Sequence, residues 1–271
     1  MIKQAIIPLA GLGTRLLPLT SVIPKEILPI NGRPNIEYIM DECIEAGIKE
    51  FIFIISKKKE SIKNYFFNDS FYNSIISKKK DKRIIKEFKK IKKYQKMIKF
   101  VYQNEPKGTG DAILKCSKLI KSSHFLILLP DDLIIKRNCT KEMIKLHKLK
   151  KASVIATKKV NQKDVSRWGI LSFKNRKKDH FLIKDVIEKP TLNEAPSNYA
   201  IIGRYILSKK IMKYIKKLKP GRAGEIHITD AIRDSIYDNE KFYGNIFKGK
   251  YLDCGTLKGY INSSLEINKI T

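Results

Sequence analysis

The chain has 271 residues, of which 42% are hydrophobic and 31% are charged, with 14 glycines and 10 prolines. This composition is typical of a globular protein and excludes collagen-like, low-complexity and mostly disordered classes. The formal net charge of +29 favours nucleic acid, an acidic surface or phosphorylated substrates as partners.

Short apolar strands alternate with amphipathic helices through the first half of the chain. In chain order, the pattern predicts a strand at 2–9, a helix at 35–46, a strand at 51–55, a helix at 59–66, a strand at 98–103, a helix at 111–119, a strand at 125–129, a helix at 141–150 and a strand at 153–157. The run at 51–55 is apolar at every position, which is typical of a strand buried on both faces of a parallel sheet. We therefore predict an α/β fold with a Rossmann-like, doubly wound sheet.

The second half of the chain is richer in strands, which are joined by polar loops. Strands are predicted at 170–173, 181–188 and 199–207, and helices at 209–218, 228–237 and 257–268. We expect these strands to form a mixed, β-rich extension of the sheet. Since no internal repeat or linker is present, we predict a single domain in which residues 1–157 and 158–271 are subregions.

The stretch 78–99 concentrates positive charge, with 12 basic residues against Asp81 and Glu87. Its apolar side chains recur at helical spacing, so we expect one face to pack and the other to be solvated. A nucleic-acid groove is the alternative, but the stretch has one Arg and few aromatic side chains for stacking. The whole chain has 47 Lys, 43 Ile and only 9 Arg. Because Lys and Ile codons are rich in A and T, a biased genome explains much of this excess, and we expect no specific nucleic-acid partner.

Several other classes of protein are disfavoured. No apolar run approaches the roughly 18 to 20 residues of a membrane span, and the N-terminus has no signal-peptide pattern, so we expect a cytoplasmic protein that does not bind membranes. The four cysteines form no C-x-x-C pair, and neither H-E-x-x-H nor G-x-S-x-G occurs. The sequence therefore does not support a zinc site, a disulfide framework or a serine hydrolase, and we expect any metal to be a hard cation on carboxylates.

A glycine-rich turn follows the first predicted strand. Ala10, Gly11, Gly13 and Thr14 lie where backbone N–H groups at the end of a strand can hold phosphates. The third glycine of the dinucleotide fingerprint is missing, and the P-loop pattern is absent. Arg15 lies in this turn, and a second cation, Lys25 of P-K-E-I-L-P, follows ten residues later. A triphosphate would need such charges.

The order of these motifs resembles the bacterial UTP:glucose-1-phosphate uridylyltransferases of the sugar-nucleotide pyrophosphorylase superfamily. Besides 11–18 and 23–29, the matching strings are Gln103 with 107–110, then 129–132, 168–170, 187–190, 195–205, 224–232 and 253–255. The resemblance covers nearly the whole chain. It implies a nucleotide-diphospho-sugar transferase fold whose β-rich extension binds the sugar.

The resemblance also implies a role for each matching residue. Arg15 and Lys25 would be catalytic, and Ala10, Gly11, Gly13, Thr14, Gln103 and Gly108 would bind the nucleotide. Asp132, Gly169, Glu188, Lys189 and Gly203 would bind the sugar phosphate, and Asp131 and Asp253 would hold Mg²⁺. From the residues alone, two adjacent carboxylates at the end of a buried strand are costly unless a cation or donors compensate them; a helix N-cap pair is the alternative interpretation.

The implied reaction converts UTP and glucose 1-phosphate into UDP-glucose and pyrophosphate by Mg²⁺-assisted in-line displacement. The chain departs from the family pattern at Ser21, where Lys is usual, and at Asp111, where His is common. Alternatives are another sugar nucleotidyltransferase, such as a thymidylyltransferase, or a non-catalytic regulatory paralogue. Glu26 and the 195–205 string favour the uridylyl type. We also expect a homo-oligomer, either a dimer or a tetramer.

Overall fold

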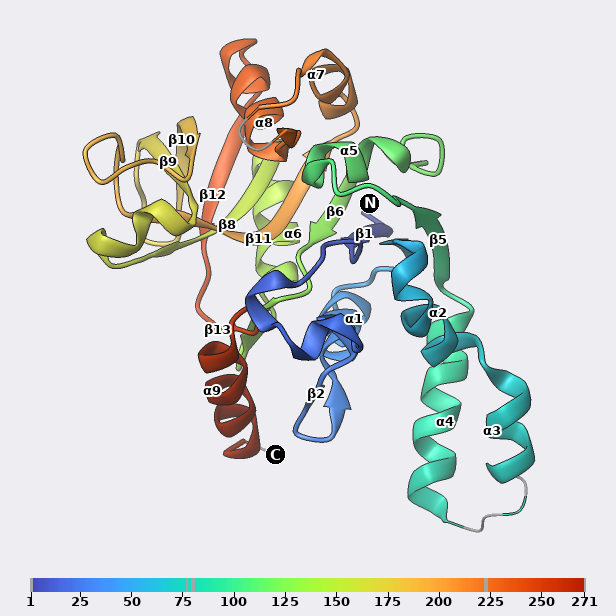
Figure 1. Ribbon diagram of the computed structural model, residues 1–271. Coiled ribbons are helices and arrows are strands. Elements are labelled where there is room, and N and C mark those ends of the chain that lie inside the picture. The colour runs from blue at the N-terminus through green and yellow to red at the C-terminus, as the bar shows by residue number, and fades with distance from the viewer. Residues whose placement is uncertain (1, 77, 79–80, 222–223, 271) are drawn as a thin grey trace.

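The computed structural model describes residues 2–76, 78, 81–221 and 224–270, and within them nine strands form one sheet (Figure 1). Their order is β5 (Ile98–Tyr102), β4 (Glu50–Ile55), β1 (Gln4–Pro8), β6 (His124–Leu128), β11 (Tyr199–Ser208), β8 (Ser153–Lys159), β12 (Phe242–Ile246), β10 (His180–Glu188) and β9 (Gly169–Lys174). Strands β5, β4, β1 and β6 are parallel, whereas β11 runs antiparallel to its neighbours β6 and β8. The sheet is therefore mixed.

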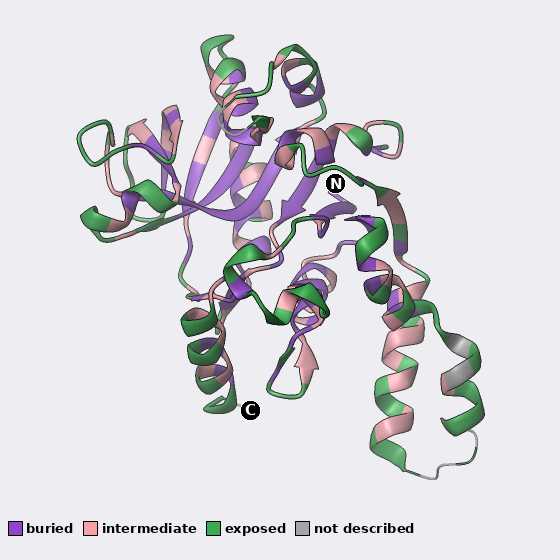
Figure 2. Ribbon diagram, in the orientation of Figure 1, coloured by how far each residue is buried: buried purple, intermediate pink, exposed green. Residues whose placement is uncertain are grey.

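The central strands of this sheet are buried (Figure 2). Because successive side chains of a strand point to opposite faces, these strands contribute to an apolar core on each face of the sheet. In β4, Phe51 and Phe53 join one apolar core, while Ile52 and Ile54 join the other. The first core includes α1 (Asn35–Glu45) and α6 (Cys139–Lys150), and the second includes α5 (Gly108–Lys115), α7 (Ile211–Lys217) and α8 (Ile228–Tyr237). This arrangement confirms the predicted α/β fold with a doubly wound sheet.

Some elements differ from the prediction. The helix expected at 111–119 is α5, which begins three residues earlier, at Gly108. Strand β12 was not predicted, because Gly244 and Asn245 interrupt its apolar pattern. Gly244 is needed there, since a Cβ would lie 2.4 Å from the ring of Phe181. Besides short 3₁₀ segments, the other unpredicted elements are α3 (Asp69–Ile76), the antiparallel pair of β7 (Asp132–Ile135) with β13 (Lys250–Asp253), and the hairpin of β2 (Pro29–Ile30) with β3 (Arg33–Pro34).

A helical arm projects from the β5 end of the sheet (Figure 1). It consists of α2 (Glu60–Phe67), α3 and α4 (Lys82–Gln95). Helix α4 is tied to α1 by Tyr94, whose hydroxyl donates to Asp41, and by Lys90, whose Nζ lies 3.1 Å from the same carboxylate. Its opposite face is exposed and carries Lys82, Lys86, Lys89, Lys93 and, just beyond its end, Lys96. Residues 79 and 80 of the predicted basic stretch lie outside the described part of the chain.

The C-terminal helix α9 (Leu257–Asn268) packs against β13 and β2, below the carboxyl edge of the sheet. Helix α9 therefore supports the short strand that ends at Asp253. Of the helices within the described residues, none combines the length and the apolarity that crossing a membrane requires.

Candidate active site

Two adjoining cavities contain every residue that the sequence nominated. The first, which we call the glycine cavity, has a volume of about 420 Å³ and is lined by Ala10, Gly11, Gly13, Thr14, Lys25, Gln103, Gly108 and Asp131 among others. The second, the carboxylate cavity, has a volume of about 310 Å³ and is lined by Arg15, Asp131, Asp132, Gly169, Glu188, Lys189, Gly203 and Asp253 among others. Asp131 and Thr109 line both cavities, so the two cavities adjoin at these residues.

The glycine-rich turn is shaped by short 3₁₀ segments after β1. Gly13 has a φ of 71° and precedes η1 (Thr14–Leu16), and its carbonyl accepts a hydrogen bond from the Thr20 hydroxyl at 2.8 Å. Positive φ favours glycine, because other residues meet steric strain there. Gly11, by contrast, has open space where a Cβ would be.

Asp131 is the centre of an ion-pair cluster. Its Oδ2 lies 2.7 Å from Lys25 Nζ and 3.3 Å from Arg15 Nη2. Burial works to raise the pKa of Asp131, but Lys25 and Arg15 hold it below its usual range. Burial likewise opposes the charge of Lys25, but Asp131 and Glu26 outweigh it, so the pKa of Lys25 is raised. Both groups are therefore charged, and neither is a free acid or base at neutral pH.

The segment that carries Lys25 is anchored by a buried ion pair between Glu26 and Lys59. Lys25 is the first residue of the 3₁₀ segment η3 (Lys25–Ile27), and the next residue, Glu26, is almost completely buried. Both carboxylate oxygens of Glu26 accept hydrogen bonds at 2.8 Å from Nζ of Lys59, which ends η4 (Lys57–Lys59). Because a buried charge is costly without a partner, this pair anchors the segment that presents Lys25.

Asp132 is positioned by the protein itself. Its Oδ2 accepts a hydrogen bond from the backbone N–H of Gly203 at 3.0 Å, and its Oδ1 accepts one from the Tyr251 hydroxyl at 2.7 Å. A Cβ at Gly203 would lie 2.4 Å from that same Oδ2. Gly203, which the resemblance assigns to sugar-phosphate binding, therefore leaves room for the Asp132 carboxylate. Burial and the Asp131 charge raise the pKa of Asp132 to about 6.

Asp253 reaches the site through the β7–β13 pair. The register of these antiparallel strands places Asp253 opposite Asp132, and the N–H of Cys254 donates to the Asp131 carbonyl at 2.7 Å. The Asp253 carboxylate accepts hydrogen bonds from Gly255 N–H at 2.8 Å and from Arg167 Nη2 at 3.2 Å. The two carboxylates that the resemblance assigns to Mg²⁺ are thus brought to one cavity by strand pairing.

Gln103 and Gly108, which the resemblance assigns to nucleotide binding, are linked by a hydrogen bond across the turn before α5. The Gln103 side-chain amide donates to the Gly108 carbonyl at 3.1 Å and to Asp111 Oδ2 at 2.7 Å. A Cβ at Gly108, whose φ is 92°, would lie 2.5 Å from the carbonyl oxygen of Ile226. The departure at Asp111 thus supplies a partner that orients Gln103. Packing against Ile226 explains why position 108 is a glycine.

The nominated sugar-side residues lie where β9 and β10 pair. Gly169 lies opposite Glu188 in this register, and a Cβ at Gly169 would be 3.1 Å from Glu188 Oε2. Lys189 has a φ of 46°, and its N–H donates to the Trp168 carbonyl at 3.0 Å. The Lys189 ammonium lies 3.9 Å from Glu188 Oε1, and both residues line the carboxylate cavity.

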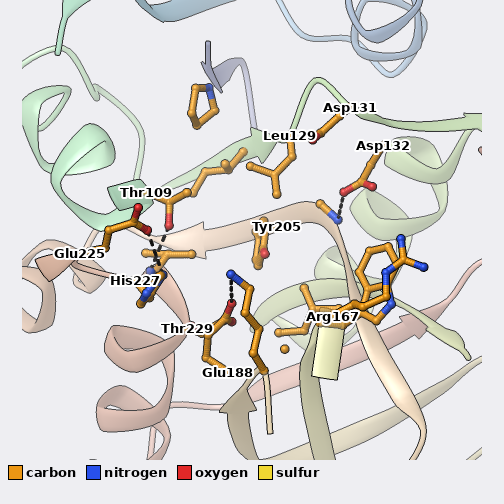
Figure 3. A pocket seen from close by; sticks show the side chains of 18 of the residues that line it. Thr109, Leu129, Asp131, Asp132, Arg167, Glu188, Tyr205, Glu225, His227 and Thr229 are labelled. Atoms are coloured by element: carbon orange, nitrogen blue, oxygen red, sulfur yellow. Dashed lines mark hydrogen bonds and ion pairs between the residues drawn. The ribbon is translucent and has the colours of Figure 1, made fainter. Parts of the chain in front are cut away.

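Sequence reasoning nominated only part of the cavity lining. Additional lining residues are Thr109, Arg167, Trp168, Glu225, His227 and Tyr251. Figure 3 shows Thr109, Glu225 and His227 on one side of the carboxylate cavity and Arg167 on the other. Trp168, Glu225 and His227 belong to strings that the resemblance already contained, so a signal for them existed. Tyr251 had none, because it lies on the unpredicted strand β13.

The residues present suit a hard divalent cation. Asp131 and Asp253 offer carboxylate oxygens, the ligands that Mg²⁺ prefers. Gly255 leaves the space beside them open, since a Cβ there would lie 2.8 Å from Asp131 Oδ2 and 2.9 Å from Arg15 Nη2. Among the described residues, no three or more His, Cys, Asp or Glu form a metal-binding group. Mg²⁺ needs no such group, because it takes one or two protein carboxylates and completes its shell with phosphate and water.

Comparison with known proteins gives matches over the whole chain. A family model described as nucleotidyl transferase matches residues 4–270. The UTP–glucose-1-phosphate uridylyltransferase of Mycoplasma pneumoniae is 37% identical over 270 residues, which covers 97% of this chain and 91% of that protein. A crystal structure of UDP-glucose pyrophosphorylase complexed with UDP-glucose is 35% identical, with a TM-score of 0.88 and 100% of both chains covered. A UTP-bound UGPase from Acinetobacter baumannii is 32% identical, with a TM-score of 0.88, and 98% of this chain and 93% of that chain are covered.

Proposed function

The chain belongs to the nucleotidyl transferase family, and on that premise we propose that it transfers the uridylyl group of UTP to α-D-glucose 1-phosphate, giving UDP-glucose and pyrophosphate. Two relatives that match this chain over nearly their full length are named UTP–glucose-1-phosphate uridylyltransferase. The observation that carries the proposal is the pair of cavities that meet at Asp131, one lined by the glycine-rich turn and the other by the carboxylates.

We assign the nucleotide to the glycine cavity and the sugar phosphate to the carboxylate cavity. Backbone groups of the turn from Ala10 to Thr14 would hold phosphates, and Gln103 with Gly108 would face the base. Glu188 would accept hydrogen bonds from glucose hydroxyls, while the Lys189 ammonium would bind the sugar phosphate. In this division, residues 1–157 contribute most of the nucleotide contacts and 158–271 most of the sugar contacts.

The chemistry needs alignment and charge compensation more than proton transfer. The phosphate of glucose 1-phosphate is already anionic, so it can attack the α-phosphorus of UTP without a general base. Lys25 and Arg15 supply preorganised positive charge for the triphosphate and the departing pyrophosphate. Asp131 and Asp253 would hold Mg²⁺, which when bound supplies further charge compensation. Lys189 holds the attacking phosphate in line.

Pyrophosphate release with glucose 1-phosphate and each of UTP, dTTP, CTP and ATP tests this proposal. We expect UTP to be strongly preferred, with no turnover in excess chelator and full recovery on adding Mg²⁺. Preference for dTTP would point to the thymidylyl type, and no turnover with any nucleotide would support a regulatory paralogue.

Two variants test the division of the pocket. Lys189→Ala should raise the KM for glucose 1-phosphate with little change in base preference, whereas Gln103→Ala should weaken discrimination between bases. Lys177→Ala, which removes an exposed lysine from another loop, is the control and should behave as the parent enzyme. A reversed pattern, with Lys189→Ala altering base choice alone, would contradict the division.

A further inference from the structure

Besides Arg15 and Lys189, a further cation, Arg167, lines the carboxylate cavity. Arg167 is the last residue of η5 (Gln162–Arg167) and lies 3.2 Å, measured from Nη2, from Asp253 Oδ2. The roles inferred from the resemblance did not include it. Its side chain is 48% exposed and that of Asp253 is 23% exposed, so the pair lies at the mouth of the cavity.

Arg167 competes for the oxygen that a metal ion would use. Asp253 Oδ1 accepts the Gly255 N–H at 2.8 Å, whereas Oδ2 accepts the Arg167 guanidinium. Oδ2 also accepts a longer hydrogen bond, of 3.5 Å, from the Thr256 hydroxyl. A metal ion that binds Asp253 through Oδ2 therefore meets a positive charge 3.2 Å from that oxygen, and displacing Arg167 relieves the repulsion between the two cations. The backbone hydrogen bond at Oδ1 keeps the carboxylate oriented during the exchange.

Arg167 has a second carboxylate within reach, which could hold it after it leaves Asp253. Its Nη1 lies 3.9 Å from Asp164 Oδ1 in the same 3₁₀ turn, and its guanidinium lies 5.8 Å from the centre of the Trp168 ring. These groups also line a separate cavity of about 460 Å³ on the other side of Arg167. A half-exposed arginine with a second carboxylate nearby can leave Asp253 at little cost.

The charges at the site support an exchange. Three cations, Lys25, Arg15 and Arg167, compensate the carboxylates Asp131 and Asp253 in the protein alone. A divalent cation adds two further positive charges beside these three, so releasing Arg167 lowers the electrostatic cost of binding the metal. Arg167 is more loosely held than Lys25, whose side chain is 14% exposed and whose distance to Asp131 is 2.7 Å.

We propose that Arg167 is an exchangeable counter-ion of Asp253, which it neutralises until the divalent metal displaces it. The inference rests on the proposed function in taking Asp253 as a metal ligand. It assigns Arg167 a positioning role: the residue sets the affinity of the metal-free site for Mg²⁺ and keeps Asp253 from repelling incoming phosphates. Metal binding to the protein alone should therefore be weakened by Arg167.

The test is a titration of the substrate-free protein with Mn²⁺, a spectroscopic stand-in for Mg²⁺, with the free ion followed by electron paramagnetic resonance. Arg167→Gln should bind the ion about two- to fivefold more tightly than the parent, since a partly exposed ion pair is lost. Arg167→Lys, which keeps the charge, should remain near the parent. Arg233→Gln is the matched control, because Arg233 pairs with Asp185 at 3.1 Å with side-chain exposures of 44% and 24%, away from Asp253.

Equal affinities in Arg167→Gln and the parent, or equal tightening in Arg233→Gln, would overturn the proposal. Asp253→Asn locates the measured ion: binding should be lost, and retained binding in that variant would also overturn it. Uridylyl transfer assayed in parallel separates this inference from the proposed function. An active enzyme with an unchanged Mn²⁺ affinity in Arg167→Gln refutes the exchange alone, whereas inactivity of the parent refutes the function.

Discussion

Buried residues at the site stay charged because groups of opposite charge lie beside them, and Lys25 is the clearest case. It is largely buried, yet Asp131 and Glu26 keep it protonated against the effect of burial. A cation held in this way costs no reorganisation when negative charge develops in a transition state. In the proposed reaction, Asp131 would thus keep Lys25 charged and in position until the triphosphate binds.

Replacing Lys25 by Ala should lower kcat by at least about a hundredfold, because a preorganised charge is removed from the transition state. Steady-state kinetics at saturating UTP and glucose 1-phosphate measure the effect, and circular dichroism checks that the fold is kept. Lys49→Ala removes an exposed lysine and should have no effect. A folded Lys25→Ala enzyme with near-normal kcat would contradict the role assigned to this residue.

His124 should make stability depend on pH. Burial, together with the His147 ring 4.6 Å away, lowers the pKa of His124 from its ordinary value of 6.5. The unfolded chain thus takes up the proton more readily than the folded protein. Neutral His124 therefore favours the folded state fully above about pH 6.5, and this contribution to the free energy of unfolding is lost as the pH falls through the pKa of His124 in the folded protein. Urea unfolding between pH 7.5 and 5 should therefore show a smaller loss of stability for His124→Asn than for the parent. Parallel pH profiles for the two proteins would count against this assignment.

At the scale of elements, the site depends on contacts between short segments far apart in the sequence. The turn of Gly108 to Gly110 is joined to the segment before α8 by two backbone hydrogen bonds, from Gly110 N–H to the Ile226 carbonyl at 2.7 Å and from Ile226 N–H to the Lys107 carbonyl at 2.9 Å. A Cβ at Gly110 would meet the Ile226 side chain at 2.7 Å. This contact connects the turn beside Gln103 to the segment carrying Glu225 and His227.

The Glu26–Lys59 pair connects two 3₁₀ segments, and its loss should be costly. Lys59→Met leaves a carboxylate buried without its partner, so we expect the free energy of unfolding to fall by about 3 to 5 kcal/mol. Urea denaturation measures the change. Adding Glu26→Gln to Lys59→Met should recover part of it, because the buried charge is removed. Lys58→Met, at an exposed neighbouring position, should change stability by no more than about 0.5 kcal/mol. Similar losses in the Lys58 and Lys59 variants would argue against an anchoring pair.

For the whole molecule, the notable property is the net charge of +29. The lysines of this region differ in their contacts, since Lys90 of α4 is paired with Glu37 and Asp41, whereas Lys86, Lys89 and Lys93 of α4 and Lys96 just beyond its end are exposed. The exposed group projects on the helical arm (Figure 1). Charges separated from the site by more than the Debye length, about 8 Å at physiological salt, have little effect on its chemistry.

Changing Lys86, Lys89, Lys93 and Lys96 together to Gln should leave uridylyl transfer within about twofold of the parent. Any binding to DNA should be indifferent to sequence and fall steeply with salt, because it rests on counterion release. A variant with Lys213, Lys216, Lys217 and Lys219 changed to Gln removes the same charge elsewhere and should weaken that binding equally. Tight, sequence-selective binding lost only in the α4 variant would show that the arm is a nucleic-acid site.

The sequence by itself determined the fold class, and it nominated residues that the structure brings to two adjoining cavities; the roles of these residues stay predictions. Apolar runs such as Phe51–Ile55 can be stable only when both faces are covered, and parallel strands bring their carboxyl ends to one edge. Residues that follow those strands, including Gly11 and Asp131, could therefore be expected to meet. The subregion boundary and the homo-oligomeric state stay predictions.

Only the tertiary structure decided which side chains are partners. Asp253 reaches the cavity through a short strand pair with no periodic signal, and Gly203 is a glycine because the Asp132 carboxylate occupies the space of its Cβ. The partners Lys59 and Arg167 likewise come from segments whose lysines and arginines look like any others in this basic chain. Local patterns report how a segment buries its own apolar surface, whereas these contacts depend on distances between segments that only the packed chain sets.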